Sequence, residues 1–301
     1  MKSPMPPDPV LSPVAWGSWR CVANPDIDTP DKLARLLEGC VAAGITTIDL
    51  ADIYGGFRVE PLVGAALAQA GIDRSAIQLV GKCGIRPVSP ARPDNRLKHY
   101  DTSPEHIRRS VANTLEALRT DHLDLLLLHR PDPLLDADAV AETLAGLVRD
   151  GRVRALGVSN HTPAQLDLLR SRLELPLATN QIQCSPLHLE PLFDGTLDQA
   201  QRLAMPPMFW SPLAGGRLVE PEDEAAQRTA AALDAVGRRM GGLSRDEVAI
   251  AWAATLPCRP VPILGSGNLE RLRRQAAAAK LRLERQDWFA ILEASRGVAV
   301  A

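Results

Sequence analysis

The sequence predicts an α/β fold, a parallel eight-stranded (β/α)₈ barrel of the TIM type with outer helices. Short apolar runs alternate with longer segments of helical spacing along the whole chain, as in repeated strand–helix units. The run Leu125–Leu128 is uninterrupted leucine, which is typical of a strand buried on both faces of a parallel sheet. The alternative is an open doubly wound sheet, but no G-x-G-x-x-G sequence follows an early strand.

Eight strands are expected from runs rich in β-branched residues or leucine. They are Val14–Gly17, Thr46–Asp49, Ile77–Lys82, Leu123–His129, Val153–Ser159, Ala178–Asn180, Met208–Ser211 and Val261–Leu264. Strands that alternate with helices in this number are expected to close into a barrel.

Helices are expected between these strands from their apolar spacing. They are Asp31–Ala43, Glu60–Ala70, Pro104–Arg119, Ala137–Arg149, Pro163–Arg172, Ala225–Met240 and Leu269–Ala279. The helix after the sixth strand is poorly marked, and Gly195–Leu203 is the best segment for it. Start signals support several of them, because Thr102 or Ser103 caps a helix with Pro104 in its first turn, Thr162 precedes Pro163 in the same way, and Ser244 opens a further helix.

Length and composition limit the classes of protein that this chain can be. Its 301 residues, 46% of them hydrophobic, suffice for a large core, and no linker divides residues 1–301, so we expect one domain. Residues 1–10 are rich in proline, lack a signal-peptide core and are expected to be a loose N-terminal leader. The net charge of −2 gives no reason to expect nucleic acid as a partner, and no apolar run suits a membrane span. Five scattered cysteines indicate a reduced, cytoplasmic protein, which we expect to be a monomer or a weak homo-oligomer.

Polar side chains gather where the predicted strands end, and in a barrel of this kind the active site lies at those ends. Asp49 ends the second strand with Tyr54 shortly after it, Lys82 ends the third strand, and His129 ends the fourth. A tyrosine stays protonated near neutral pH and can donate a proton to a carbonyl oxygen while hydride reaches the carbon. A lysine cation beside the phenol favours the phenolate that then appears. Asp49 would hold Lys82 charged, and His129 would orient the carbonyl oxygen.

The aspartate between these two positions, Asp52, has no readable side-chain direction because the strand ends before it. We interpret it as a loop cap or a solvated charge. A metal-dependent barrel hydrolase that uses Asp49, Asp52, His129 and Asp132 is an alternative reading of the same rim. The chain lacks paired histidines at metal-ligand spacing, so we expect no metal site.

Several segments, in the correct order, make nearly the whole chain resemble the aldo-keto reductases. TTIDLADIYG resembles the signature of the family's second strand, LVGKCG supplies its lysine, and LDLLLLHRPD supplies its histidine. The chain is most similar to a bacterial branch of general NADP-dependent oxidoreductases. The resemblance implies reversible, NADPH-dependent reduction of a small aldehyde or ketone by direct hydride transfer. It implies Tyr54 as the general acid, assisted by Lys82 and Asp49, with His129 orienting the carbonyl.

The same resemblance implies a set of cofactor-binding residues. They are Ser159, Asn160, Gln181, Trp210, Ser211, Leu213, Gly265, Ser266, Arg271 and Gln275. Many family members carry lysine where this chain has Gly265, whereas Ser266 and Arg271 match the segment that grips the adenosine 2′-phosphate. Because a guanidinium binds phosphate bidentately, we expect NADPH or NADP⁺, with NAD(H) as the less favoured cofactor.

Loops after the strand ends are expected to shape the site for a small carbonyl substrate. Candidate substrate contacts are Trp19, Phe57 and Arg130. Arg20 and Arg130 either favour an anionic group on the substrate or are ordinary surface arginines. We expect Ile85–Thr102 to be a long, proline-rich loop and Ala214–Gly216 to be a hinge.

A non-catalytic NADP(H)-binding regulatory or sensor subunit is the alternative function. Some family members act in this way within larger assemblies. The presence of all four residues of the catalytic set favours the enzyme.

Overall fold

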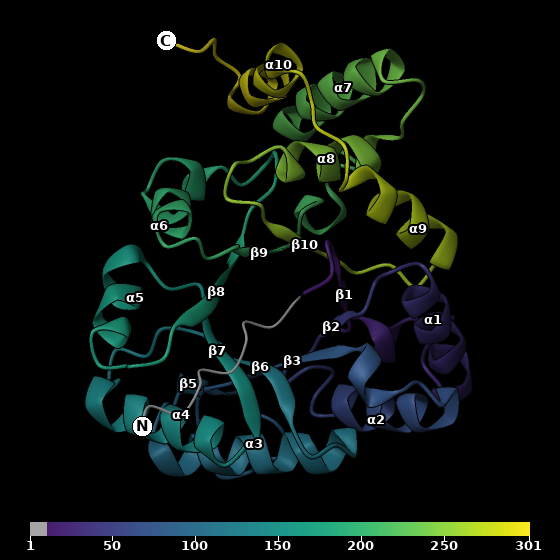
Figure 1. Ribbon diagram of the computed structural model, residues 1–301. Coiled ribbons are helices and arrows are strands. Elements are labelled where there is room, and N and C mark those ends of the chain that lie inside the picture. The colour runs from purple at the N-terminus through teal and green to yellow at the C-terminus, as the bar shows by residue number, and fades with distance from the viewer. Residues whose placement is uncertain (1–10) are drawn as a thin grey trace.

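The strands form one closed ring in the computed structural model, which describes residues 11–301. Their order around the ring is β1–β10–β9–β8–β7–β6–β3–β2, and helices surround the ring on its outside (Figure 1). The predicted (β/α)₈ barrel is therefore confirmed. The expected leader, residues 1–10, lies outside the described residues.

All eight neighbouring strand pairs of the barrel are parallel. The strands are β1 Ala15–Gly17, β2 Thr47–Asp49, β3 Gln78–Cys83, β6 Leu123–Leu128, β7 Val153–Ser159, β8 Leu177–Gln183, β9 Met208–Trp210 and β10 Val261–Leu264. The main difference from prediction is β8, which is longer at both ends than the expected Ala178–Asn180. Gln181 and Gln183 in its last part are polar, so apolar periodicity did not reveal that the strand continues.

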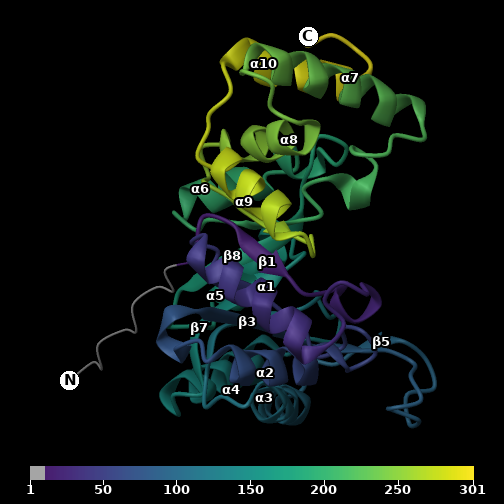
Figure 2. The ribbon, with the colours of Figure 1, turned by 90° about the vertical axis from the view of Figure 1, so that its right-hand side faces the viewer.

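Most helices alternate with the strands and cover the outside of the barrel (Figure 2). The helices are α1 Pro30–Ala42, α2 Val59–Ala70, α3 Pro104–Leu118, α4 Ala137–Arg149, α5 Pro163–Arg170, α6 Thr196–Arg202, α7 Glu224–Arg239, α8 Arg245–Ala254, α9 Leu269–Ala278 and α10 Arg285–Arg296. By contrast, α7 and α8 both lie between β9 and β10 in the chain, and α7 and α10 pack outside α8 (Figure 2). The weakly marked helix after the sixth barrel strand is α6, and Ser244 precedes α8 with a capping box. α10 was not predicted; it packs beside α7, and its Trp288 stacks on Trp252 of α8 with ring centroids 5.0 Å apart.

The predicted loop Ile85–Thr102 contains a short antiparallel hairpin of β4 Ile85–Arg86 and β5 His99–Tyr100. The segment between these two strands extends away from the barrel (Figure 2). The prediction of an unbroken loop is therefore wrong at its two ends, where strands of two residues are too short for a sequence pattern to indicate.

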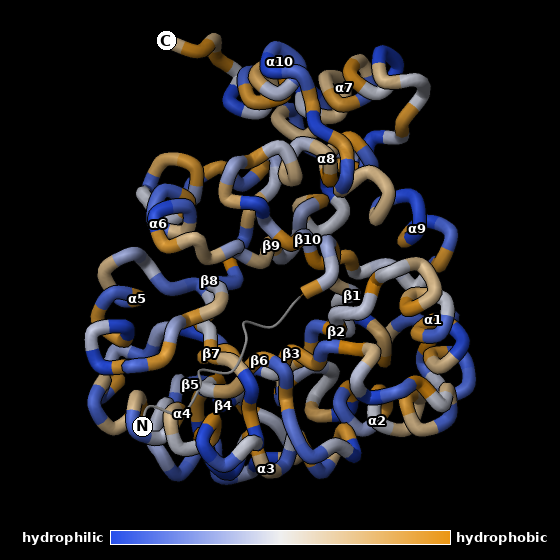
Figure 3. Tube along the Cα trace, viewed as in Figure 1, coloured by the Kyte–Doolittle hydropathy of each residue, from blue (hydrophilic) through white to orange (hydrophobic). Residues whose placement is uncertain are grey.

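Apolar residues concentrate on the strands and on the helix faces turned toward them, and polar residues lie on the outer helix faces (Figure 3). All six residues of β6 are buried, as the leucine run predicted. Gly64 lets α2 approach α3 closely, because a Cβ there would lie 2.2 Å from the carbonyl oxygen of Ala117. Within residues 11–301, no helix combines the length and the apolar composition that crossing a bilayer requires.

Candidate active site

Three strands that are neighbours in the ring bring the predicted catalytic side chains together. The ring order places β2 beside β3 and β3 beside β6. Asp49 is the last residue of β2, Lys82 is the penultimate residue of β3, and His129 directly follows β6. Because parallel strands end at one edge of a sheet, these residues share one rim of the barrel.

Lys82 is fully buried, and its ammonium group has three hydrogen-bond partners. Its Nζ atom donates hydrogen bonds to the carboxylate of Asp49 at 2.8 Å, to the carbonyl oxygen of Leu50 at 2.6 Å and to the phenol oxygen of Tyr54 at 3.0 Å. An ammonium has three donors, so none remains unpaired. Burial lowers the pKa of Lys82, but the charges of Asp49 and Tyr54 and their hydrogen bonds more than offset it and leave the pKa raised. Lys82 is therefore a cation at neutral pH.

Tyr54 remains a protonated phenol in this environment. Burial raises its pKa above the ordinary 10, and the charge of Lys82 lowers it by less. The sequence-based expectation that Lys82 favours the phenolate has the right direction, but burial is the larger effect. The consequence is that Tyr54 can act as a proton donor at neutral pH.

His129 lies beside Tyr54 as a neutral imidazole. The two ring centroids are 5.9 Å apart and the ring planes meet at 74°. Burial lowers the pKa of His129 to about 2, helped by the positive charges of Lys82, Arg130 and Lys98. Its Nδ1 atom is buried and has no hydrogen-bond partner among the described residues. A neutral imidazole carries a single N–H, so His129 can donate one hydrogen bond.

Asp52, which we interpreted as a loop cap or a solvated charge, is a partly buried carboxyl group with a side-chain partner. Its Oδ2 atom accepts a hydrogen bond of 2.6 Å from Ser110 on α3, while its backbone N–H donates to the carbonyl oxygen of Lys82 at 3.3 Å. Burial raises the pKa of Asp52 to about 6. A second buried acid nearby, Glu60, accepts from Thr114 and has a pKa raised by burial to about 8. Glu60 was missed, because helical position alone does not reveal which polar residue faces inward.

A chain of hydrogen bonds connects the candidate cofactor residues on β7, β8 and β9. Trp210 donates through Nε1 to Asn160 at 3.0 Å, Asn160 donates to Ser159 at 2.7 Å, and Ser159 donates to the carbonyl oxygen of Gln181 at 2.9 Å. The side chain of Gln181 donates to Asp49 at 2.7 Å. This last contact joins the candidate cofactor residues to the predicted catalytic residues, and no sequence pattern indicated it.

Backbone strain marks the same rim. Asn160 and Ser211 both have positive φ values, 58° and 52°, as does Ala214 at 52°. Non-glycine residues adopt this region at a cost. Positive φ also occurs away from the rim, at Arg119, Ala204 and Arg259, so it supports a functional site here only together with the hydrogen bonds above. Leu213 lies partly buried beside Ala214, and Arg20 donates to the carbonyl oxygen of Gly215 at 3.1 Å, so the loop after β1 reaches the predicted hinge.

In the segment after β10, some of the predicted cofactor residues are exposed and others are already hydrogen-bonded within the protein. Gly265 and Arg271 are exposed, and the carbonyl oxygen of Ser266 accepts a hydrogen bond of 3.1 Å from the buried indole of Trp16. Asn268 caps α9 by accepting from the backbone N–H of Arg271. Gln275 is buried, and its amide donates to Asp246 at 2.8 Å, so that amide is already engaged.

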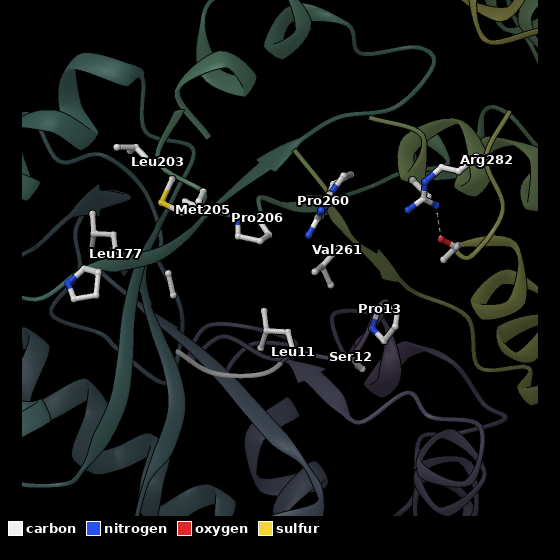
Figure 4. Close-up of a pocket in the computed structure, with 16 residues that line it drawn as sticks. Leu11, Ser12, Pro13, Leu177, Leu203, Met205, Pro206, Pro260, Val261 and Arg282 are labelled. Carbon is white, nitrogen blue, oxygen red and sulfur yellow. Dashed lines mark hydrogen bonds between the residues drawn. The ribbon is translucent and has the colours of Figure 1, made fainter. Parts of the chain in front are cut away.

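A cavity of about 520 Å³ opens at the opposite end of the barrel, where the strands begin (Figure 4). It is lined by residues such as Pro13, Leu177, Pro206 and Val261, and by none of the predicted site residues. The part of the chain that the structure describes holds no group of three or more His, Cys, Asp or Glu side chains placed to bind a metal ion. Asp132, named for the hydrolase alternative, accepts hydrogen bonds from Thr102.

A closed parallel barrel whose rim unites a phenol, an ammonium, a carboxylate and an imidazole is typical of oxidoreductases that act on carbonyl groups. Comparison with known proteins specifies the class further. The model of the Aldo/keto reductase family matches residues 13–296. The chain therefore belongs to the aldo/keto reductase family and is an oxidoreductase, and membership implies a nicotinamide cofactor.

Individual relatives agree with this assignment. The chain is 45% identical over 296 residues to oxidoreductase YdhF of Escherichia coli, covering 98% of this chain and 97% of the relative. It is 42% identical over 292 residues to a 6-dehydroglucose reductase of Agrobacterium fabrum, covering 97% and 96%. Among solved structures, a thermostable aldo-keto reductase superposes with a TM-score of 0.79 at 25% identity, covering 94% of this chain and 95% of that one.

Proposed function

We propose that the protein reduces a small aldehyde or ketone to the alcohol with NADPH, reversibly and by direct hydride transfer. The observation that carries the proposal is the position of Lys82, whose Nζ atom donates to both Asp49 and Tyr54. A buried ammonium in this position suits proton transfer from Tyr54, because its positive charge stabilises the phenolate that forms when the phenol loses its proton.

The proton comes from Tyr54. When bound, the cofactor supplies hydride to the carbonyl carbon. Tyr54 donates its phenolic proton to the carbonyl oxygen, so that one hydride and one proton convert the carbonyl to the alcohol. The phenolate left behind is stabilised by Lys82, and Asp49 keeps Lys82 charged and fixed in place. The reverse reaction uses the same phenolate as a base.

His129 orients the substrate oxygen. Its imidazole is neutral because burial and three nearby cations lower its pKa to about 2. A neutral imidazole donates its single N–H to the carbonyl oxygen without competing with Tyr54 as the acid. A donor of this kind is worth about 2.7–4 kcal/mol of transition-state stabilisation.

The residues after β10 fit the adenosine end of NADPH. Ser266 and the exposed guanidinium of Arg271 stand at the start of α9, where backbone N–H groups favour an anion. These donors support a 2′-phosphate and hence NADPH over NADH. The hydrogen-bonded residues Ser159, Asn160 and Trp210, at the ends of β7 and β9, support a nicotinamide site on the same rim.

A sugar-derived carbonyl compound is the substrate class that the relatives favour, since two that are 42% and 41% identical are named 6-dehydroglucose reductases. We also propose that residues 1–301 form one functional domain. We place the enzyme in the cytoplasm, because all five cysteines are unpaired and buried and unpaired cysteines are typical of a reducing compartment.

Stopped-flow mixing of the NADPH-bound protein with a panel of small aldehydes and hydroxylated aldehydes tests the proposal. We expect a decrease of NADPH absorbance that depends on the aldehyde. Intact NADPH binding without any oxidation above buffer would favour the sensor subunit instead.

A further inference from the structure

Three arginines at the rim of the barrel each lie over an aromatic ring. Arg20 lies 5.5 Å from the ring centroid of Trp19, Arg92 lies 4.5 Å from that of Phe57, and Arg130 lies 5.8 Å from that of Trp210. Trp19 and Phe57 belong to the loops after β1 and β2, and Trp210 ends β9. Guanidinium groups and aromatic faces therefore alternate around the mouth that a substrate must enter.

These arginines are not neutralised by carboxylates. Within residues 11–301, neither they nor Lys98 forms an ion pair. The acids closest in sequence to Arg130 and Lys98 have other partners: Asp132 accepts from Thr102 and Leu134, and Asp101 pairs with Arg86. The rim thus carries uncompensated positive charge.

Arg130 is the cation best placed to meet a substrate. It follows His129 at the end of β6, yet its guanidinium lies near Trp210 at the end of β9, and β7 and β8 separate these two strands. The indole of Trp210 reaches back toward β7, where it donates to Asn160, so the side chains of Arg130 and Trp210 meet at the mouth of the barrel. Arg130 is partly buried, and its charge acts on both Tyr54 and His129.

Resting on the proposed function, we infer that the natural substrate carries an anionic group, a carboxylate or a phosphate, which Arg130 binds while the carbonyl meets Tyr54 and His129. A guanidinium offers a planar pair of donors that matches either oxyanion. Lys98 and Arg92 add attraction from the neighbouring loop, and the faces of Trp19 and Phe57 remain for the carbon skeleton of a sugar. A sugar acid or sugar phosphate with a reactive carbonyl has all these features.

Matched substrates that differ only in charge test this inference. Succinate semialdehyde is compared with butanal, and D-glyceraldehyde 3-phosphate with D-glyceraldehyde, each with NADPH at pH 7. We expect kcat/KM to be at least tenfold higher for the anionic member of one pair or both, since a charge-assisted hydrogen bond contributes about this much. The pair that shows the larger preference assigns the oxyanion as carboxylate or phosphate. Raising the ionic strength should reduce the preference, because salt screens exposed charges.

Two variants test whether Arg130 causes the preference for anionic substrates. Arg130→Gln should reduce the preference for the anion at least tenfold, with a smaller loss on the neutral aldehydes. Arg108→Gln removes the same charge from the exposed outer surface of α3 and should keep the wild-type preference.

Equal kcat/KM for charged and neutral partners, unchanged in Arg130→Gln, would overturn the inference and leave the proposed function intact. The absence of NADPH oxidation with all four aldehydes would instead remove the proposed function, and this inference with it.

Discussion

The ammonium nitrogen of Lys82 lies 3.0 Å from the phenol oxygen of Tyr54 and 2.8 Å from the carboxylate of Asp49. Lys82 is buried, and so is the Asp49 carboxylate. The carboxylate also accepts a hydrogen bond from Gln181, so its position is fixed from two sides of the barrel. Lys82 thus stabilises the fold through its ion pair with Asp49 and also donates a hydrogen bond to the phenol oxygen of Tyr54.

Substitution of Lys82 by methionine should therefore reduce both stability and turnover. The change leaves Asp49 buried without its cation, and breaking a buried pair in this way costs about 3–5 kcal/mol of unfolding free energy. Urea unfolding at pH 7 measures that cost. The double variant Lys82→Met/Asp49→Asn should regain part of the stability, because no buried charge remains, but none of the turnover. A double variant that recovers activity would show that the ammonium has no role in catalysis.

The preference for NADPH should depend on Arg271. Arg271→Ala is expected to raise the dissociation constant of NADPH about tenfold or more and to leave that of NADH within about twofold, since only NADPH has a 2′-phosphate. Arg273, exposed on the same helix, provides the matched control through Arg273→Ala. Fluorescence titration with both cofactors measures the effect. Equal losses for the two cofactors would contradict phosphate recognition by Arg271.

Gly265 offers a gain-of-function test of the same segment. It is exposed, and a Cβ at this position would contact nothing within 4 Å, so a longer side chain fits. Gly265→Lys should tighten NADPH binding several-fold through one more cation near the phosphate, with no matching change for NADH. An unchanged ratio of the two dissociation constants would place the 2′-phosphate away from this residue.

Asp52 should make stability depend on pH in the acidic range. Burial raises its folded pKa to about 6 from the ordinary 3.8, so the folded state holds the proton more tightly than the unfolded chain. This contribution to stability is fully present below about pH 4 and is lost as the pH rises through about 6. Asp52→Asn still accepts a hydrogen bond from Ser110 but does not ionise.

Unfolding free energies at pH 4 and pH 7 measure this effect. Their difference should be smaller in Asp52→Asn by on the order of 1–3 kcal/mol. Asp94→Asn, an exposed change in the β4–β5 segment, should retain the pH dependence of the wild type. A variant that follows the wild-type curve would mean that Asp52 is ionised in the folded state at pH 4.

The barrel and the meeting of Asp49, Lys82 and His129 could be predicted from the sequence, because strand–helix alternation fixes which residues end strands. A barrel brings all these ends to one rim, so no detailed geometry was needed. The same reasoning placed Tyr54 near the rim without giving its distance from Lys82.

Side-chain directions could not be predicted in the same way. Asp52 follows the end of β2, where alternation no longer indicates which side a residue faces, and it is partly buried and accepts a hydrogen bond from Ser110. The reach of Arg130 toward Trp210 and the bond from Gln181 to Asp49 join residues on different strands. Such contacts depend on how strands are staggered around the ring, which periodicity along the chain does not contain.

Single-turnover oxidation of bound NADPH by a saturating aldehyde, compared between the wild type and Tyr54→Phe, tests the central role of the phenol most directly. Phenylalanine keeps the ring beside His129 but has no proton to give. We predict an unchanged NADPH dissociation constant and a rate lower by about 10²–10⁴-fold. A variant that oxidises NADPH at nearly the wild-type rate would show that the proton comes from another group.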